Sequence, residues 1–341
     1  MRLVTRADFD GIVCGALITL MEEIDSYLFV EPKFMQDGMV KIREGDIIAN
    51  LPYHPHCSLW FDHHVTNAPA WERVSSFESR VSSLKSRNPE PETRNPAVVE
   101  GKGGFRLAPS AARVVYEYYI TIANTASQES KIQNPKSKIV EGLKVFGSER
   151  MRYLLEETDR IDAGQLVPED VLHPQGYVLI SMTLDGKRAE DEPYWLRLIG
   201  LLRDASLEET LRDSEVKQRC QQILDAQETL KKILLKRTTL KGNVIFVDLR
   251  GIKDMPDGNR FLLYTLFPAG NISLKVADDS QRPNTTAISV GYNIFNTTSK
   301  VNVGALLEKH GGGGHKVVGS CRVPSSEAEK AVKAILEAIK E

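Results

Sequence analysis

Residues 57–64 read CSLWFDHH, an apolar run with two aromatic residues that stops at Asp62, His63 and His64. Such a run predicts a buried strand that ends in a polar loop. An aspartate and two histidines at the end of a buried strand cost free energy unless they have polar partners. A metal ion is one such partner, since neutral imidazole is a common metal ligand and a carboxylate can fix its tautomer. A pair of surface histidines is the other interpretation.

Two earlier apolar runs end in the same way. RLVT (2–5) leads to Asp8 and Asp10 in the sequence ADFDG, and DIIA (46–49) leads to Asn50. An apolar helical pattern follows the first run, so strands alternate with helices, which predicts a parallel α/β sheet. Ligands of open parallel sheets bind outside the carboxyl ends of the strands. We therefore expect these polar residues and the DHH segment at one edge of one sheet.

Carboxylates in two segments extend the metal hypothesis. Asp8 and Asp10 are separated by one residue, so both can turn toward one divalent cation, which favours oxygen ligands. Asp-Gly pairs also form ordinary turns, and a turn is the alternative for this motif. Asp162, in DRIDAG (159–164), is a further carboxylate in a predicted loop that could complete the cluster.

A glycine run, GGGGH at Gly311–His315, follows a helix-like segment at 303–310. Four glycines leave the backbone bare, so its N–H groups can approach phosphate oxygens, and the histidine can donate to the same anion. A flexible linker is the usual meaning of a glycine run, but apolar segments flank this one. Basic residues near the run predict a local basic patch: Lys300, Lys309, Lys316 and Arg322.

The length of 341 residues exceeds what one hydrophobic core usually organises, so two domains are expected. We predict a metal-binding domain at 1–205, a charged connecting helix at 206–239 and a β-rich substrate-binding domain at 240–341. Two polar stretches, at about 73–104 and 125–139, lack sustained apolar periodicity and are predicted to be surface insertions.

The charge balance limits the size of the polyanionic substrates that the protein can bind. Lys plus Arg total 44 against 46 for Asp plus Glu, a formal net charge of -2. A protein that grips long duplex DNA over its whole surface is normally basic, so a polyanionic substrate has to be small or held by a local patch. The four cysteines form no C-x-x-C pair, which argues against a zinc knuckle or a disulfide framework. The N-terminus lacks a signal-peptide run and no stretch approaches the roughly 20 apolar residues of a membrane span, so we expect a cytoplasmic protein with no membrane partner.

Taken together, in this order and spacing, the segments resemble the DHH phosphoesterase family with its DHH-associated C-terminal domain. The matching residues are Asp8 and Asp10 for the first motif, Asp62-His63-His64 for the motif that names the family, Asp162 for the fourth motif and Gly311–His315 for the C-terminal glycine signature. The resemblance implies an α/β fold of two domains. It also implies a metal-dependent phosphoesterase of the exopolyphosphatase-like or short-oligonucleotide phosphodiesterase group.

The resemblance further implies two divalent ions, Mn²⁺ first and Mg²⁺ second, which together activate a water molecule. Their expected ligands are Asp8, Asp10, Asn50, His63 and Asp162. The residues expected to carry the catalytic chemistry are Asp62, His63 and His64. Those expected to bind substrate are Arg6, Ser299, Lys300, Gly313, Gly314 and His315.

Two positions depart from the family pattern. The second motif normally supplies an aspartate that bridges both ions, whereas this chain has Asn50, a neutral and poorer bridging ligand. Arg6 stands where many relatives have a histidine, and an arginine suits phosphate better than metal. His54 and His56 lie just beyond Asn50 and either compensate or are surface histidines. These two departures do not change the expected fold, but they can weaken or abolish catalysis.

The expected substrates are short oligonucleotides, cyclic dinucleotides, adenosine phosphosulfate derivatives or polyphosphate, with a homodimer as one expected assembly. Tyr292 and Phe295 could stack on a base, which favours a nucleotide, or be core residues. The alternative function is a nucleotide- or phosphate-binding protein that keeps the fold with weakened catalysis. A kinase or nucleotidyl transferase is disfavoured, because the sequence has no G-x-x-x-x-G-K-[ST] loop.

Overall fold

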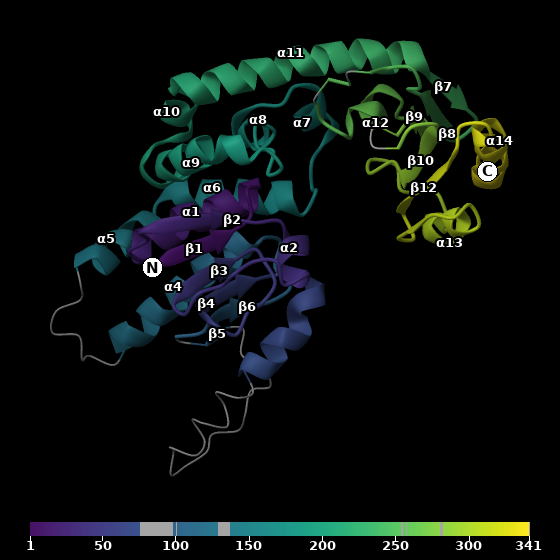
Figure 1. The fold of residues 1–341 in the computed structure, drawn as a ribbon. Coiled ribbons are helices and arrows are strands. Elements are labelled where there is room, and N and C mark those ends of the chain that lie inside the picture. Colours follow the sequence, from purple (N-terminus) through teal and green to yellow (C-terminus); the bar gives the residue numbers. More distant parts are fainter. Residues whose placement is uncertain are drawn as a thin grey trace. The chain divides into compact units, whose positions relative to one another are not determined.

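The protein is described by a computed structural model that covers residues 1–75, 98–99, 101–128, 137–253, 255–256, 258–279 and 282–340. The chain divides into two compact units (Figure 1). Unit 1 comprises Met1–Leu166 and Gln175–Gln218, and unit 2 comprises Val167–Pro174 and Arg219–Glu341. Each unit contains one six-stranded sheet, which confirms the predicted α/β fold of two domains.

The sheet of unit 1 has the strand order β2-β1-β3-β4-β6-β5. All neighbours pair in parallel except the antiparallel pair β5 and β6. Its strands are β1 (Arg2–Thr5), β2 (Ser26–Phe29), β3 (Asp46–Ala49), β4 (Cys57–Asp62), β5 (Val98–Val99) and β6 (Gly103–Phe105). The three strands predicted from apolar runs, β1, β3 and β4, are adjacent, so the polar residues that follow them come to one edge of the sheet.

Helix α1 (Phe9–Met21) is buried over nearly its whole surface, as its apolar composition predicts. It packs against α4, α5, α6 and α9, which explains why it carries no polar face. The other helices of unit 1 are α2 (Pro32–Gln36), α4 (Ala111–Gln128), α5 (Ser137–Phe146), α6 (Glu149–Asp162), α8 (Gly176–Ser181), α9 (Glu192–Asp204) and α10 (Leu207–Arg212), with 3₁₀ turns η1 (Val65–Asn67) and η2 (Ala189–Asp191).

Three expectations need correction. The stretch predicted as an insertion at 73–104 ends in β5 and β6, because β6 pairs in parallel with β4 and extends the sheet; much of the rest of both stretches lies outside the described residues. The predicted continuous helix at 206–239 is interrupted at Asp213, which accepts from the backbone of Glu215 and Val216 and so begins a new helix, α11 (Ser214–Arg237). Asp162, expected in a loop, lies in the last turn of α6.

Unit 2 has a second sheet with the order β11-β12-β10-β9-β8-β7. Its pairs are antiparallel except for β8 and β9, which are parallel. The strands are β7 (Thr238–Lys241), β8 (Val244–Asp248), β9 (Ile272–Asp278), β10 (Thr285–Tyr292), β11 (Gly313–Gly314) and β12 (Val318–Pro324). Helices α7 (Pro168–Leu172), α12 (Leu262–Leu266), α13 (Val303–Glu308) and α14 (Ala328–Ile339) complete the unit, together with most of α11.

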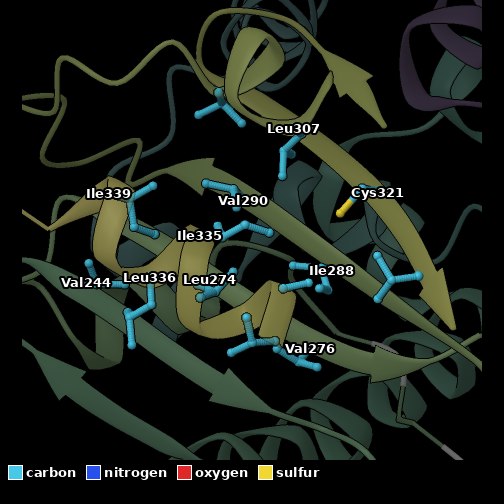
Figure 2. Close-up of a cluster of buried hydrophobic side chains, with 14 of the residues drawn as sticks. Val244, Leu274, Val276, Ile288, Val290, Leu307, Cys321, Ile335, Leu336 and Ile339 are labelled. Carbon is cyan, nitrogen blue, oxygen red and sulfur yellow. The ribbon is translucent and has the colours of Figure 1, made fainter. Parts of the chain in front are cut away.

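One face of the second sheet carries the hydrophobic core of unit 2. Alternate residues of β9 and β10, such as Leu274 and Ile288, point to the same side as Cys321 of β12. Figure 2 shows these side chains packed against Ile335 and Ile339 of α14. Within the described ranges, no helix combines the length and apolar character needed to cross a bilayer.

Candidate functional site

The carboxyl ends of β1, β3 and β4 bring the predicted metal-binding residues together in unit 1. Asp8 caps α1 just after β1, Asn50 follows β3, and His63 follows β4. Asp162 reaches the same place from the end of α6. The expectation that parallel strands would gather these side chains at one sheet edge therefore agrees with the geometry.

Asp10 is the buried centre of this group. Its two oxygens accept hydrogen bonds of 2.9 and 2.8 Å from the backbone N–H groups of Ala111 and Ala112, at the start of α4. Burial, followed by the nearby charges of Asp162 and Asp8, raises the pKa of Asp10 well above its ordinary value. Two N–H donors at a helix N-terminus favour a carboxylate. They fix the direction of Asp10, and among the described residues the Cys14 thiol adds one weak side-chain donor at 3.9 Å.

His63 places a ring nitrogen beside Asp10. Its Nδ1 donates a 3.0 Å hydrogen bond to the carbonyl of Ala108, so the lone pair lies on Nε2. Nε2 is buried and has no hydrogen-bond partner among the described residues. It lies 3.8 Å from an Asp10 oxygen and 3.4 Å from an Asp162 oxygen. The ligand atoms of these three residues all lie within 4.8 Å of one another, which fits a divalent ion between them.

The end of α6 is held in place by a second aspartate. Asp159 accepts a 2.6 Å hydrogen bond from the Ser110 hydroxyl and pairs with the Arg113 guanidinium, both at the start of α4. Asp162 follows one turn later, and burial raises its pKa. Gly164, with φ of 66°, ends the helix directly afterwards. The clamp on Asp159 therefore fixes the turn that presents Asp162.

Asp8 differs from Asp10 because neighbouring side chains, as well as a backbone N–H, contact its carboxylate. One of its oxygens accepts from Gly11 N at 2.9 Å and from Asn50 Nδ2 at 3.0 Å, and the other pairs with Arg6 at 3.0 Å. Arg6 also lies 3.5 Å from Glu31. Asn50 is buried and has a φ of 58°, a backbone conformation that asparagine and aspartate adopt more readily than most residues. The Asp8 oxygens therefore contact a guanidinium and an amide, which occupy positions that a metal ion would need.

Asp62 and His64 form a hydrogen-bonded pair beside the group of Asp10, His63 and Asp162. Asp62 is fully buried and accepts from His64 Nδ1 at 2.8 Å and from Asn67 Nδ2 at 2.6 Å. The hydrogen bond to Asp62 raises the pKa of His64. Both oxygens of Asp62 are thus engaged, which suits a supporting role. His56 is 54% exposed and its ring contacts that of His54, so these two histidines lie outside the group.

The predicted substrate-binding residues other than Arg6 lie in unit 2. Gly313 and Gly314 form β11, and the N–H of His315 donates to Val318. A Cβ added to Gly314 would lie 2.3 Å from the carbonyl of Val318, whereas one added to Gly313 would meet nothing within 4 Å. The fold itself therefore requires Gly314 but not Gly313. Ser299 and Lys300 line a cavity of the same unit.

Several residues of the site escaped sequence reasoning. The backbone groups of Ala108, Ala111 and Ala112 leave no trace in a sequence, since any residue supplies them. Nothing in the sequence links Ser110 or Arg113 to Asp159. The predicted basic patch is divided: Arg322 pairs with Asp279, whereas Lys316 and Lys300 line the cavity.

Comparisons with known proteins bear on this geometry. The pGpG-specific phosphodiesterase PggH of Vibrio cholerae is 30% identical, with a TM-score of 0.73 over 99% of this chain and 98% of that one. A RecJ of Thermus thermophilus in complex with Mn²⁺ is 13% identical, with a TM-score of 0.47 over 98% of this chain and 52% of RecJ. No family model and no curated protein matches. Because the likeness to PggH spans nearly both chains and the predicted motifs of unit 1 meet at one sheet edge, the chain belongs to the DHH family of phosphoesterases.

Proposed function

We propose that this protein hydrolyses the phosphodiester bond of a linear dinucleotide, or of a similarly short oligonucleotide, with the help of divalent ions. The observation that carries the proposal is the group Asp10, His63 and Asp162, with an unpartnered Nε2 at its centre. The likeness to a pGpG-specific phosphodiesterase over the whole chain supports a dinucleotide rather than polyphosphate or a longer strand.

The first ion would be held by Asp10, His63 and Asp162. Mn²⁺ fits a donor set of one imidazole and two carboxylates, and Mg²⁺ is the second candidate. A second ion would lie toward Asp8 and Asn50, where it has to displace Arg6 from Asp8. Such ions lower the pKa of a bound water molecule and offset the charge of the phosphate.

The chain's own groups prepare this chemistry. The N–H groups of Ala111 and Ala112 orient Asp10 and favour its ionised form, whereas its burial favours the protonated form. The Ala108 carbonyl keeps the proton of His63 on Nδ1 and its lone pair on Nε2. His64, paired with Asp62, can give a proton to a leaving oxygen if the substrate comes within its reach. Arg6 offers a guanidinium at the edge of the group for a phosphate oxygen.

The test is product formation from pGpG, cyclic di-GMP and tripolyphosphate in Mn²⁺ and in Mg²⁺. We expect GMP from pGpG, no product from His63→Ala, and wild-type activity from His56→Ala, a matched histidine outside the group. A wild-type protein that binds pGpG without cleaving it with either ion would contradict hydrolysis. That outcome would favour the alternative, a binding protein of the same fold, which the contacts of Asp8 with Arg6 and Asn50 would then explain.

A further inference from the structure

Arg6 lies between two carboxylates at the edge of the candidate metal site. Its Nη1 is 3.0 Å from an Asp8 oxygen, and its Nη2 is 3.5 Å from a Glu31 oxygen. The parallel pairing of β1 and β2 sets this arrangement, because the N–H of Val30 donates to the Thr5 carbonyl just past the last paired residues. Arg6 and Glu31, which come next in their segments, therefore lie side by side.

The two ion pairs of Arg6 are unequal and leave its guanidinium incompletely satisfied. The contact with Asp8 is within hydrogen-bond distance, whereas the contact with Glu31 is longer than a normal hydrogen bond. The Nε of Arg6 is buried and has no hydrogen-bond partner among the described residues. A guanidinium carries five N–H donors in one rigid plane, so it cannot turn all of them to one carboxylate. A small shift away from Asp8 therefore improves the contact with Glu31.

Glu31 is placed to receive Arg6 after such a shift. Glu31 occupies the N-cap position of α2, but its side chain makes no capping hydrogen bond, so the helix does not use its carboxylate. A Cβ added to Gly186 would lie 2.8 Å from a Glu31 oxygen, so glycine at this position makes room for the carboxylate. Within the described ranges, the ion pair of Glu31 is the one with Arg6.

A second ion changes the partner that Arg6 needs. An ion at Asp8 takes the carboxylate with which Arg6 pairs, and it brings a divalent charge close to the guanidinium. Two cations at such a distance repel each other, and a nearby anion reduces the repulsion. A carboxylate at the other terminal nitrogen of Arg6 draws the guanidinium away from the ion and replaces the lost pair. Glu31 is in that position.

We propose that Glu31 is a positioning residue that takes up Arg6 when a second ion binds Asp8. The assignment rests on the proposed function, because it concerns the second of the ions named there. Without that ion, Arg6 pairs with Asp8. With the ion bound, Arg6 pairs with Glu31 and keeps N–H donors for a phosphate oxygen of the substrate. Glu31 thus acts through Arg6 and contacts neither the ion nor the substrate.

The test titrates Mn²⁺ into the full-length protein by calorimetry in the absence of substrate. We expect a tight first ion and a weaker second ion. Glu31→Gln should weaken the second ion by about three- to fivefold, the effect of one partly exposed ion pair, and leave the first ion unchanged. Glu44→Gln is the matched control, because Glu44 is 84% exposed and lies near His56, outside the group. It should bind both ions as wild type does.

A double-mutant cycle separates the position of Glu31 from its charge. Arg6→Gln should tighten the second ion, because it removes the competitor for Asp8. Adding Glu31→Gln to Arg6→Gln should then change the affinity by less than about twofold, since Glu31 has no guanidinium left to hold. An equal loss in both backgrounds would show that Glu31 acts by its own charge and would overturn the assignment. A wild-type protein that binds a single ion would overturn it as well.

Cleavage of pGpG by the same variants keeps this test distinct from the test of hydrolysis. If the cycle behaves as expected but no ion supports cleavage, the role of Glu31 stands and the proposed hydrolysis fails. If wild type cleaves pGpG while Glu31→Gln binds the second ion as tightly as wild type, hydrolysis stands and the role of Glu31 fails.

Discussion

Replacing Asn50 with aspartate tests how the two halves of the proposed metal site differ. Asn50 Nδ2 donates a 3.0 Å hydrogen bond to Asp8, and Asn50 is 2% exposed. Aspartate tolerates the φ of 58° at this position, so the backbone need not change. The substitution therefore turns one attractive contact into two adjacent carboxylates while leaving Asp10, His63 and Asp162 as they are.

The expected change in the free energy of unfolding follows from these contacts. The lost hydrogen bond contributes about 1 kcal/mol. Two unit charges about 4 Å apart repel each other by roughly 4 kcal/mol at an effective dielectric constant of 20. Asp8 is 30% exposed and pairs with Arg6, which reduces the repulsion. We expect the free energy of unfolding of the metal-free protein to fall by about 2–3 kcal/mol, which lowers the Tm by about 5–10 °C.

Mn²⁺ should reverse this loss, because an ion between the carboxylates of residues 8 and 50 removes their repulsion. The assay is thermal unfolding in EDTA and in Mn²⁺, with bound Mn²⁺ counted by calorimetry. Asn67→Asp is the control, since Asn67 also donates to an aspartate, the buried Asp62; it should lose stability that Mn²⁺ does not restore. If Asn50→Asp is as stable as wild type in EDTA, or binds no more Mn²⁺ than wild type, the reasoning about Asn50 is refuted.

The remaining predictions concern pH and the glycine signature. Burial raises the pKa of both Asp10 and Asp162, so these two carboxyl groups bind more protons in the folded protein than in the unfolded chain. In EDTA the contribution of these two carboxyl groups to the free energy of unfolding should fall as the pH rises above their ordinary pKa range. Mn²⁺ binding should release protons, measured by calorimetry in buffers of different ionisation enthalpy, and Mn²⁺ binding without proton release would contradict this. Gly314→Ala should lower the free energy of unfolding by about 2 kcal/mol or more, because φ is 151° and Val318 is too close. Gly313→Ala should leave stability within about 0.5 kcal/mol. Its added Cβ should keep the phosphate away from the backbone N–H and so raise the KM for pGpG about tenfold, the effect of one lost charged hydrogen bond. Equal effects of the two substitutions on stability would show that Gly313 too is structural.

The strands that position the site were accessible from sequence because each is an apolar run that stops abruptly. The bounds of β3 agree with the apolar run DIIA, and β4 ends one residue later than expected, at Asp62. A parallel sheet brings such ends together, so the gathering of Asp10 and His63 follows from topology. Their roles as metal ligands and the substrate roles of Ser299, Gly313 and His315 stay predictions.

Sequence reasoning failed where the structure depends on pairing between distant segments. Strand β6 contains two glycines and no apolar run, and it is a strand only because β4 lies beside it. A Cβ on Gly103 would lie 2.0 Å from the carbonyl of Trp60, so this glycine permits the close approach. Likewise Asp162 was expected in a loop because small residues follow it, but the clamp on Asp159 keeps the helix intact through that turn.

The contacts of Asp8 also distinguish it from Asp10 among the acidic groups at this sheet edge. Asp10 has backbone donors but no cation, and its raised pKa records the free energy that burial costs. Asp8, by contrast, is neutralised by Arg6 and receives the amide of Asn50. An ion at Asp10 relieves an existing cost, whereas an ion at Asp8 must first displace favourable contacts. The two affinities should therefore differ widely, and the chain's own guanidinium, rather than the number of carboxylates, would set the metal concentration at which the second ion binds.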